Sequence, residues 1–236
     1  MDATSKPTNC RTTSSNRAGN FLSQLTPAAV QDLEATQHVS EYPANRVIFA
    51  ERDTPDAVFI VISGGVKLSI NSSDGRRLSL RIVHAGEILG LAPVLSGTPY
   101  EVTAETLYPG KIARIERKEF LNFLARHPES YKGVTHELSR NVNLACDRLR
   151  VVGLSTSAPE KLARLLLDWD ENGHESENKA RFRFCLTHEQ IGEFIGASRE
   201  TVTRTMSTFK VRRLVDFQGS MLTIPSRTAL ASYARS

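Results

Sequence analysis

The chain has 236 residues, of which 40% are hydrophobic and 24% are charged, and its formal net charge at pH 7 is +4. These values exclude a disordered or fibrous protein and leave room for two domains, each able to bury a core. The cysteines, Cys10, Cys146 and Cys185, are too scattered for a disulfide framework or a metal finger, which favours a reducing compartment. No apolar run approaches the roughly 20 residues that span a bilayer, so we expect a cytoplasmic protein without a signal peptide or a membrane partner.

The first 45 residues contain few signals of regular structure. Residues 1–20 are rich in Ser, Thr and Asn and nearly free of large apolar side chains, which predicts a disordered arm. A short helix is predicted after Thr26, because proline is favoured at the first position of a helix and Pro27 stands there. Val30 and Leu33 are expected to face inward from this helix.

From about residue 46 to residue 115 the sequence is typical of short strands. Runs of β-branched and aromatic residues alternate with glycine-containing turns, and Asp74-Gly75 between two such runs is a strong hairpin signal. The expected strands cover residues 47–50, 57–62, 66–70, 78–83 and 112–115. Short strands at this spacing predict an all-β roll or barrel.

A long helix is predicted from Pro128 to about Val152. Its apolar and small residues recur at intervals of four and three, which is the seam spacing of a coiled coil. The seam consists of Tyr131, Thr135, Leu138, Val142, Ala145, Leu149 and Val152. A helix this long must bury its stripe, and we expect the seam from Leu138 onward to form the interface between two copies of the chain. Packing of the stripe on the chain's own β-domain is the alternative.

Residues 186–210 have the pattern of a helix-turn-helix. Thr187 and Gln190 are spaced as a capping box at the start of the first helix. Gly196 is expected to end that helix, because glycine accepts the positive φ of a helix C-terminus. Ser198 then opens the second helix as its N-cap.

Elements predicted on either side complete a winged domain. Residues 153–159 break the long helix and are interpreted as a hinge, and a helix follows over residues 160–169. Its inward residues are Leu162, Leu165 and Leu166. After the helix-turn-helix, the β-prone runs 214–217 and 221–224 flank Gly219, which predicts a hairpin.

The second helix of the motif carries charges suited to a DNA duplex. Five of the six charged residues from Arg199 to Arg213 are basic, and Glu200 is the exception. A helix that enters the major groove by its N-terminal end brings its first turns to the base edges. The expected base-reading residues are Arg199, Glu200, Thr203 and Arg204. The expected phosphate contacts, which add affinity without sequence choice, are Thr187, Ser198, Lys210, Arg212 and Arg213.

The run Ser198-Arg199-Glu200-Thr201-Val202-x-Arg204, with Ile191-Gly192 before it and a Gly-tipped hairpin after it, resembles the Crp–Fnr family of bacterial transcription regulators. The resemblance extends from about Phe21 to Ile224. It implies an α+β fold with an N-terminal cyclic-nucleotide-binding-type β-roll, a long dimerisation helix and a C-terminal winged helix-turn-helix. The corresponding ranges are 21–127, 128–153 and 154–236. The resemblance also implies a homodimer that binds double-stranded DNA, with RNA polymerase as a further partner.

Within the family, the pattern Arg199-Glu200-x-x-x-Arg204 is similar to the version that reads a pseudo-palindromic TGTGA-like site. The FNR-type version keeps the glutamate and the second arginine but has serine where Thr203 stands. Arg199 therefore favours TGTGA-like half-sites, whereas Thr203 leaves TTGAT-like half-sites as the alternative.

Family members that bind cyclic AMP carry a Gly-Glu-Leu cassette followed downstream by Arg-Ser, which hold the ribose and the cyclic phosphate. In this chain Gly86-Glu87 resembles the Gly-Asp that precedes the cassette, so Leu91 stands where the ribose-binding glutamate is needed. No Arg-Ser follows, Glu101 would repel a phosphate, and Ala145 stands in place of an adenine-contacting threonine. The resemblance therefore implies that cyclic AMP does not gate this chain in the usual way.

The sequence leaves the effector and any cofactor unknown. The candidate pocket for a small apolar ligand or heme consists of Leu89, Leu91, Glu101, Ala145 and Cys146, although ordinary core packing explains the leucines more simply. His84 is a candidate axial ligand, with plain exposure at a strand end as the commoner alternative. Cys146 is either a thiol sensor or a buried small residue, and Cys10 by itself cannot hold an iron–sulfur cluster. No metal site is predicted.

These observations favour a homodimeric, sequence-specific transcription regulator. In it, the β-roll would shift the conformation of the hinge near Gly153 and so change the separation or orientation of the two reading helices. An alternative from another class is an effector-binding signalling module whose helix-turn-helix mediates protein contacts, and the basic bias of residues 199–213 argues against it. An enzyme is not expected, because the sequence has no nucleophile elbow, no paired metal-ligand motif and no Gly-rich phosphate loop.

Overall fold

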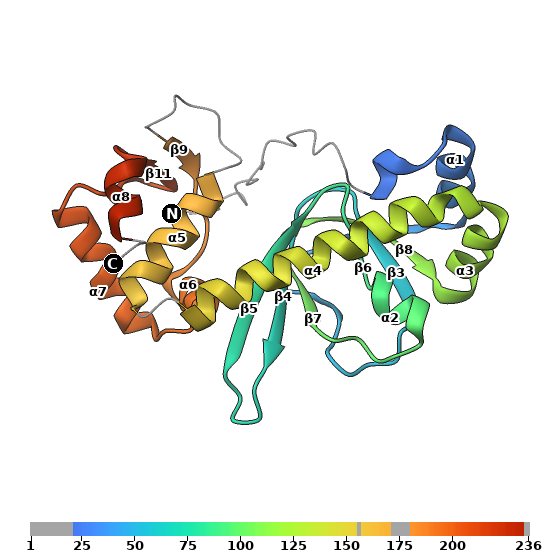
Figure 1. Cartoon of the computed structure of the whole chain (residues 1–236), viewed down its shortest axis with the longest axis horizontal. Helices are drawn as coiled ribbons and strands as arrows, with labels where there is room; N and C mark the ends of the chain where they lie inside the picture. The colour runs from blue at the N-terminus through green and yellow to red at the C-terminus, as the bar shows by residue number, and fades with distance from the viewer. Residues whose placement is uncertain (1–20, 155–156, 171–179, 234–236) are drawn as a thin grey trace, which may run out of the picture. The chain divides into compact units, whose positions relative to one another are not determined.

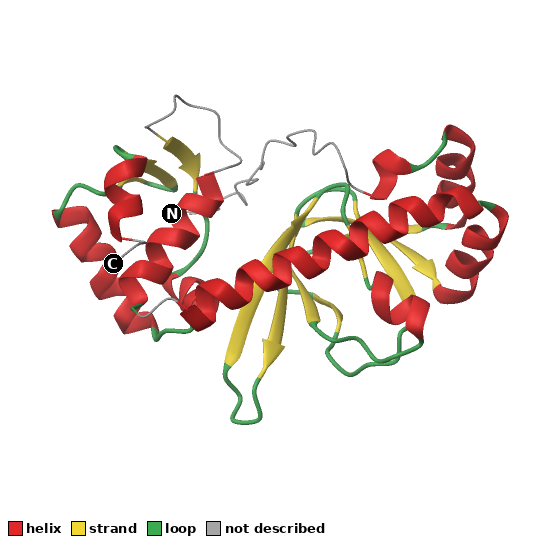
Figure 2. Ribbon diagram, viewed as in Figure 1, coloured by secondary structure: helices red, strands yellow, loops and turns green. Residues whose placement is uncertain are grey.

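The computed structural model describes residues 21–154, 157–170 and 180–233, so the arm predicted over residues 1–20 lies outside the described residues. The chain divides into two compact units, one formed by residues up to 70 with 80–144, the other by 71–79 with 145–236. Figures 1 and 2 show that strands dominate most of the first unit and helices most of the second. The mixed helix and strand content agrees with the α+β expectation.

The first unit contains two four-stranded sheets. One sheet has the order β1 (His38–Tyr42), β8 (Gly110–Glu116), β3 (Ala57–Val61), β6 (Ile88–Leu89). The other has the order β2 (Val47–Phe49), β7 (Thr103–Tyr108), β4 (Gly65–Asn71), β5 (Arg77–His84). Neighbouring strands run antiparallel, as where Val58 on β3 lies opposite Ile115 on β8. The two sheets form the β-roll that the strand spacing predicts.

The strand prediction was correct for the apolar strands and incomplete elsewhere. The turn at Asp74-Gly75 joins β4 to β5, and Gly75 has a φ of 81°, as the hairpin signal requires. Three strands, β1, β6 and β7, were missed. Four of the five residues of β1 are exposed and β6 has two residues, so neither strand shows the alternation that marks a half-buried strand.

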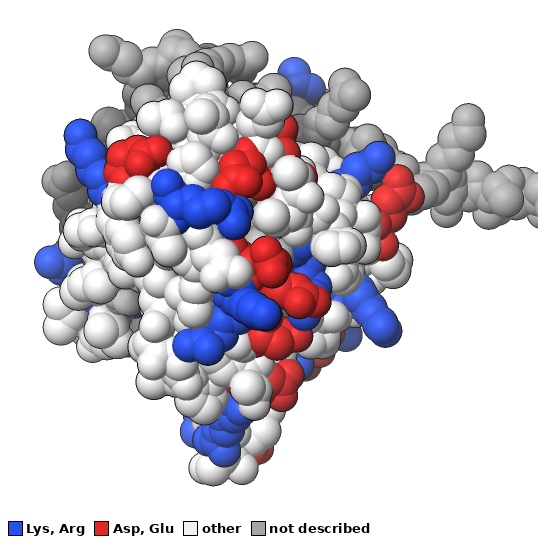
Figure 3. Space-filling model, turned by 90° about the vertical axis from the view of Figure 1, so that its right-hand side faces the viewer, with Lys and Arg blue, Asp and Glu red and all other residues white. Residues whose placement is uncertain are grey.

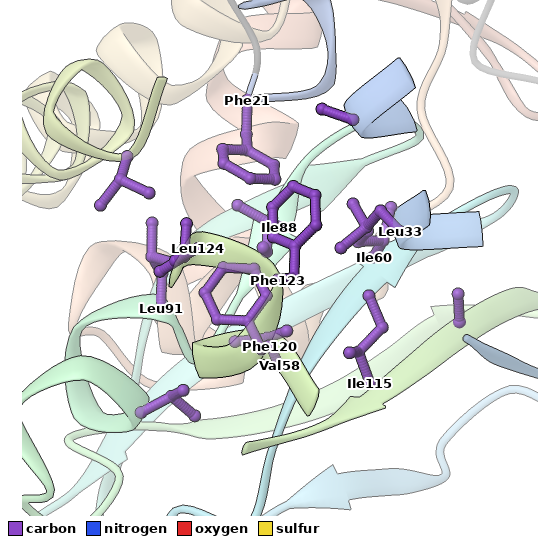
Figure 4. Packing of buried hydrophobic residues seen from close by; sticks show 14 residues of the cluster. Phe21, Leu33, Val58, Ile60, Ile88, Leu91, Ile115, Phe120, Phe123 and Leu124 are labelled. Atoms are coloured by element: carbon purple, nitrogen blue, oxygen red, sulfur yellow. The ribbon is translucent and has the colours of Figure 1, made fainter. Parts of the chain in front are cut away.

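Helices and one end of the roll share a hydrophobic core. The elements are η1 (Phe21–Gln24), α1 (Pro27–Thr36), α2 (Leu91–Ser96), α3 (Arg117–Arg126) and η2 (Pro128–Ser130). Figure 4 shows Phe120, Phe123 and Leu124 of α3 packed among Phe21, Ile88 and other residues of this core. The helix with Pro27 at its first position is confirmed, and Thr26 caps it by accepting from the backbone N–H of Ala29. The inward residues of α1 are Ala29 and Leu33, whereas Val30 is half-buried, which corrects the expectation for Val30.

A second core lies between the two sheets and contains an aromatic stack. The ring of Phe49 lies 4.1 Å from the ring of Tyr100 and 5.5 Å from that of Phe59, measured between centroids. The Tyr100 hydroxyl donates to the carbonyl oxygen of Ala57 at 2.6 Å and lies 3.2 Å from a carboxylate oxygen of Asp56. Burial raises the pKa of Tyr100 to about 12, and the charge of Asp56 acts in the same direction.

The long helix α4 (Tyr131–Leu154) has two different faces. One face is buried on the roll through Gly133, Val134 and Glu137, and Val134 belongs to the same core as Phe123. The opposite face exposes apolar side chains, with Val142 exposed by 61% and Leu149 by 70%. The helix therefore packs on its own β-domain and still leaves an apolar stripe uncovered within the chain.

The second unit contains a helical core and a small sheet. Its elements are α5 (Ala158–Asp170), α6 (His188–Ile195), α7 (Arg199–Val211), α8 (Arg227–Tyr233), β9 (Ala180–Arg183), β10 (Asp216–Gln218) and β11 (Met221–Ile224). Leu162, Leu165 and Leu166 on α5 are buried, as expected. The predicted hairpin is β10–β11, with Gly219 at φ 62°, although Leu214 and Val215 precede the first strand. The third strand β9 and the helix α8 were not predicted.

None of the described helices combines the length and the apolarity needed to cross a bilayer.

We expect the substitution Tyr100→Phe to lower the free energy of unfolding by about 1–3 kcal/mol at pH 8, because the carbonyl of Ala57 would lose its buried donor. The folded pKa of Tyr100 lies above its unfolded value, so the contribution of the hydroxyl is complete below pH 10. That contribution is lost as the pH rises towards 12. Urea unfolding followed by circular dichroism at pH 8 and pH 11 should therefore show a smaller difference between the two proteins at pH 11.

The matched control for this experiment is Tyr131→Phe, because the Tyr131 side chain is 49% exposed. It should leave the unfolding free energy within a few tenths of a kcal/mol of the unsubstituted chain at both pH values. Equal stability of the Tyr100→Phe variant and the unsubstituted chain at pH 8 would contradict the role given to this hydroxyl.

Candidate nucleic-acid interface and effector region

The first helix of the helix-turn-helix begins at a complete capping box. The hydroxyl oxygen of Thr187 accepts from the backbone N–H of Gln190 at 3.2 Å, and the Gln190 side chain accepts from the backbone N–H of Thr187 at 2.9 Å. Gly196 ends the helix with a φ of 65°, in the left-handed region that glycine tolerates. Both predictions for the ends of α6 are confirmed.

The turn between α6 and α7 depends on a close backbone approach at Gly192. A Cβ atom at this position would lie 2.5 Å from the carbonyl oxygen of Ala197, so only glycine fits without movement of the turn. The backbone N–H of Ala197 donates to the carbonyl of Gly192 at 3.0 Å. Ser198 then caps α7 by accepting from the N–H of Thr201 at 3.2 Å, which confirms the second N-cap.

The two faces of α7 differ in burial. Val202, Met206 and Phe209 are buried against the rest of the second unit. The opposite face is exposed and carries the four residues expected to read bases. We call Arg199, Glu200, Thr203 and Arg204 the reading surface. Positions four apart on a helix share a face, so Arg199 lies beside Thr203 and Glu200 beside Arg204.

Glu200 is held in its charged form. Hydrogen bonds from its own backbone N–H and from the Ser198 hydroxyl, together with the charge of Arg199, lower the pKa of its carboxyl below the usual value. The carboxylate is therefore an acceptor at neutral pH. One carboxylate and two guanidinium groups on the same surface offer acceptors and donors to base edges that present both.

The residues expected at phosphates lie at both ends of the motif. Lys210 and Arg213 are exposed at the C-terminal end of α7, and Thr187 and Ser198 are exposed at the caps. Arg212 has an additional partner, because its guanidinium lies 5.5 Å from the ring centre of Tyr233 on α8 and is hydrogen-bonded to the Tyr233 hydroxyl. No sequence pattern predicts that interaction, which joins residues 21 positions apart.

One residue of the motif was missed by the sequence analysis. His188 is the first residue of α6, and its Nδ1 atom lies 2.8 Å from the hydroxyl oxygen of Thr203 on the reading surface. Nothing in the local sequence around His188 indicates a contact with a residue 15 positions further along the chain. Only the crossing of α6 and α7 brings the two side chains together.

The candidate pocket residues do not share one environment. Leu89 belongs to the core that contains the aromatic stack, whereas Leu91 belongs to the core that contains Phe120. Their burial is ordinary packing, as the simpler interpretation proposed. Glu101 is exposed, and Ala145 and Cys146 are exposed on α4, so the expectation that Cys146 is a buried small residue was wrong for the single chain.

The position of the nucleotide cassette is closely packed. Gly90 has a φ of 74°, and a Cβ atom there would lie 3.0 Å from the Tyr100 ring and 3.1 Å from the carbonyl oxygen of Ala57. Tyr100 comes from the segment that, by the resemblance, is expected to correspond to the Arg-Ser of the family cassette. An aromatic ring thus fills space beside the cassette position, where a phosphate-binding site would need polar donors.

A buried network of charges connects α4 to the turn between β5 and β6. The carboxylate of Glu87 is paired with Arg81 and lies 3.3 Å from Arg140, which also bonds Glu137 at 2.6 Å. Asn141 accepts from Arg81 at 3.1 Å. Burial by itself would lower the pKa of Arg140, but the hydrogen bond and charge of Glu137 and the charge of Glu87 outweigh it and raise that pKa.

His84, the candidate axial ligand, is the last residue of β5 and is half-buried rather than exposed. Among the described residues no group of three or more His, Cys, Asp or Glu side chains could hold a metal ion.

The surface in Figure 3 carries charges of both signs close together. In the first unit such charges form pairs, for example Arg126 with Asp32 at 2.8 Å and Arg114 with Asp56 at 2.9 Å. A mixed surface of this kind does not present the uniform positive potential that attracts a phosphate backbone.

Comparison with known proteins identifies both parts of the chain. Residues 39–127 match the cyclic nucleotide-binding domain, and residues 160–233 match the Crp-like helix-turn-helix domain. The chain belongs to the Crp–Fnr family. It is a Crp-like transcription regulator, and its curated relatives are transcription regulators rather than enzymes.

Two of these curated relatives align over most of their length. The "CRP-like cAMP-activated global transcriptional regulator" of Mycobacterium tuberculosis is 27% identical over 220 residues, which cover 93% of this chain and 97% of that protein. The "Transcriptional activatory protein AadR" of Rhodopseudomonas palustris is 27% identical over 208 residues, covering 87% of this chain and 85% of that protein.

Solved structures share the fold of this chain. FixK2 from Bradyrhizobium japonicum is similar with a TM-score of 0.73 and 21% identity, over 84% of this chain and 96% of that one. A CooA mutant from Carboxydothermus hydrogenoformans is similar with a TM-score of 0.72 and 17% identity, over 96% of this chain and 99% of that one.

Proposed function

We propose that this chain is a homodimeric regulator that binds a pseudo-palindromic DNA site with TGTGA-like half-sites through the reading surface. The observation that carries the proposal is the arrangement of α7, whose buried face fixes the helix while Arg199, Glu200, Thr203 and Arg204 stand exposed on the other face. Arginine can bind both acceptors of a guanine, and a carboxylate accepts from the amino group of a cytosine. RNA polymerase is the further partner that we propose from the family's role in transcription.

The choice of half-site rests on the order of these side chains. Arg199, Glu200 and Arg204 follow the pattern of the family version that reads TGTGA-like sequences. Glu200 and Arg204 are shared by both family versions, so Arg199 is the side chain on which this choice depends. TTGAT-like half-sites are the alternative outcome of the same experiment.

Selection of bound sequences from a random DNA pool should recover TGTGA-like half-sites one helical turn apart. On the recovered site, Arg204→Ala should cost roughly 1–3 kcal/mol of binding free energy and relax the choice at one base pair. Lys210→Ala should weaken binding evenly across sequences and reduce the magnitude of the salt slope by about one, because it removes a single phosphate-binding charge. Fluorescence anisotropy with the selected and a scrambled duplex at several salt concentrations measures both effects.

Equal losses on the selected and the scrambled duplex for both variants would contradict the separate roles of Arg204 and Lys210. Enrichment of half-sites with neither a TGTGA-like nor a TTGAT-like core would contradict the proposed site. No binding to any duplex at low salt would favour the signalling module whose helix-turn-helix contacts protein.

Self-association is supported by the exposed face of α4. Val142 and Leu149 are exposed by 61% and 70%, and Tyr131 on the same face of the helix is exposed by 49%. Val142 and Leu149 lie one heptad apart in the predicted seam, with Ala145 between them. A pair of such helices would bury these side chains against each other, which is the main source of stability for long helices. Leu138 is half-buried against the chain's own core, so it contributes to the seam only in part.

Leu149→Glu should convert the dimer into a monomer, because it places two like charges in the seam in place of buried apolar side chains. Light scattering after gel filtration measures the mass, and we expect the variant to lose its affinity for the full operator as well. Asn143→Glu is the matched control, since Asn143 is an exposed polar residue off the seam. A dimeric Leu149→Glu protein would contradict the proposed interface.

We further infer that cyclic AMP does not regulate this chain in the usual way. Leu91, which stands at the ribose-binding position, is buried in the core, and the Tyr100 ring lies beside the cassette. Neither side chain can bind a ribose hydroxyl or a phosphate as the family cassette does. The name of the Mycobacterium tuberculosis relative describes that protein as cAMP-activated, so a direct binding experiment decides the matter for this chain.

Cyclic AMP at micromolar concentration should leave the melting temperature of the purified protein unchanged, because a ligand stabilises a fold only when it binds the folded state. Differential scanning fluorimetry with cyclic AMP, and with 5′-AMP as a control for general nucleotide effects, measures this. A rise of several degrees with cyclic AMP alone would show that the site binds it after all.

A further inference from the structure

The hydroxyl group of Thr203 is engaged inside the protein, although its side chain is exposed on the reading surface. Its oxygen lies 2.9 Å from the carbonyl oxygen of Arg199 and 2.8 Å from Nδ1 of His188. A carbonyl oxygen can only accept, so the single hydroxyl proton points to Arg199. The histidine nitrogen must then be the donor, and the hydroxyl oxygen accepts from Nδ1–H.

These two bonds restrain the rotamer of Thr203. A threonine in a helix divides between two rotamers, one of which directs its hydroxyl to the carbonyl four residues earlier. Thr208 makes the same bond to the carbonyl of Arg204 at 3.0 Å. At Thr203 the contact with His188 comes from a different helix and adds a second restraint on the same oxygen. The direction of the Thr203 methyl group is thereby set before any DNA is bound.

The group that Thr203 offers to a base edge follows from these restraints. A hydroxyl has one donor and two acceptor lone pairs, of which the donor and one lone pair are used within the protein. The methyl group has no partner requirement and lies on an exposed face of α7. Among the groups on the major-groove edges, the 5-methyl of thymine is the one that an apolar side chain matches. A polar base atom placed against the methyl would lose its hydration without gaining a hydrogen bond.

We propose that Thr203 is a specificity-determining residue that reads the 5-methyl group of a thymine in each half-site. His188 is the positioning residue that holds Thr203 in the required rotamer. The inference rests on the proposed function, since it assumes that the reading surface enters the major groove. The inference names the group on the DNA, the thymine 5-methyl, that one residue of the reading surface recognises.

The experiment replaces thymines by deoxyuridine, which removes only the 5-methyl group and keeps the base pairing. Each thymine of the operator recovered by selection is replaced in turn, in both half-sites, and affinity is measured by fluorescence anisotropy. One replacement should weaken binding by roughly fourfold per half-site, the effect of exposing one buried methyl group. We call this loss the uracil penalty.

Variants at Thr203 separate the methyl group from the hydroxyl. Thr203→Val keeps a methyl group at the same place and should retain the uracil penalty, whereas Thr203→Ser removes the methyl group and should abolish it. Thr208→Ser is the matched control, because Thr208 is also exposed on α7 and bonded to the carbonyl four residues earlier. It should leave the penalty unchanged at every thymine.

Variants at His188 test the positioning role. His188→Ala should reduce the uracil penalty by releasing Thr203, and His188→Asn should restore it, because the amide N–H can donate from nearly the same place as Nδ1–H. All substituted side chains are exposed or half-buried, so thermal unfolding should show folded proteins of similar melting temperature. A purely structural histidine would change the melting temperature and leave the penalty unaltered.

The outcomes distinguish this inference from the proposed function. A protein that selects an operator but is indifferent to uracil at every thymine would overturn the inference and leave the proposed function standing. Retention of the penalty in Thr203→Ser, or its loss in Thr203→Val, would show that the methyl group is not the recognised feature. An unchanged penalty in His188→Ala would remove the positioning role of His188. Failure of the protein to enrich any sequence would contradict the proposed function and the inference together.

Discussion

The close approach of Gly192 to the backbone of Ala197 is the constraint on which the reading surface depends. The turn folds back onto α6 so closely that a Cβ atom would lie 2.5 Å from the carbonyl oxygen of Ala197. This approach sets the crossing of α6 and α7, which pack on each other, and Phe194 on α6 and Phe209 on α7 are both buried. Because one face of α7 is fixed in the core, the polar side chains on its other face are positioned as a group. Contacts with base edges require that kind of shared rigidity, since each depends on the direction of a hydrogen bond or a methyl group.

The long helix α4 packs on its own β-domain with one face and leaves an apolar face exposed on the other side. Its inner face carries Glu137 and Arg140 in a buried network with Glu87, where each charge has an opposite partner. Removing Arg140 would take away the ion-pair partner of the buried Glu137 carboxylate, which favours a single register of the helix on the roll. Its outer face remains apolar and exposed, as a second copy would require. The polar network thus ties the helix to its own domain while the apolar seam stays available for a partner.

The β-roll has the fold of a cyclic nucleotide-binding domain, and its interior beside Gly90 is apolar and aromatic. Leu89 and Leu91 belong to two separate cores, and Tyr100 contributes an aromatic ring beside Gly90. The phenol is satisfied by the backbone of Ala57, so it needs no ligand to complete its hydrogen bonds. The fold and the ligand chemistry of this domain are therefore separable, because the strand pairing depends on the backbone and the ligand site depends on a few side chains.

The sequence by itself determined the features that depend on residues close together in the chain. The capping box of Thr187, the glycine stop at Gly196, the Asp74-Gly75 hairpin and the inward leucines of α5 all rest on spacings of a few residues, and each is present in the structure. The tertiary structure decided the features that join distant residues. The strands β1, β6 and β7 are defined by their pairing with other strands. Arg81 is hydrogen-bonded to Asn141, 60 positions away, and His188 to Thr203, 15 positions away. The physical reason is that caps and turns are satisfied by their own neighbours, whereas strand edges, buried charges and side-chain orientation are settled only by what packs against them.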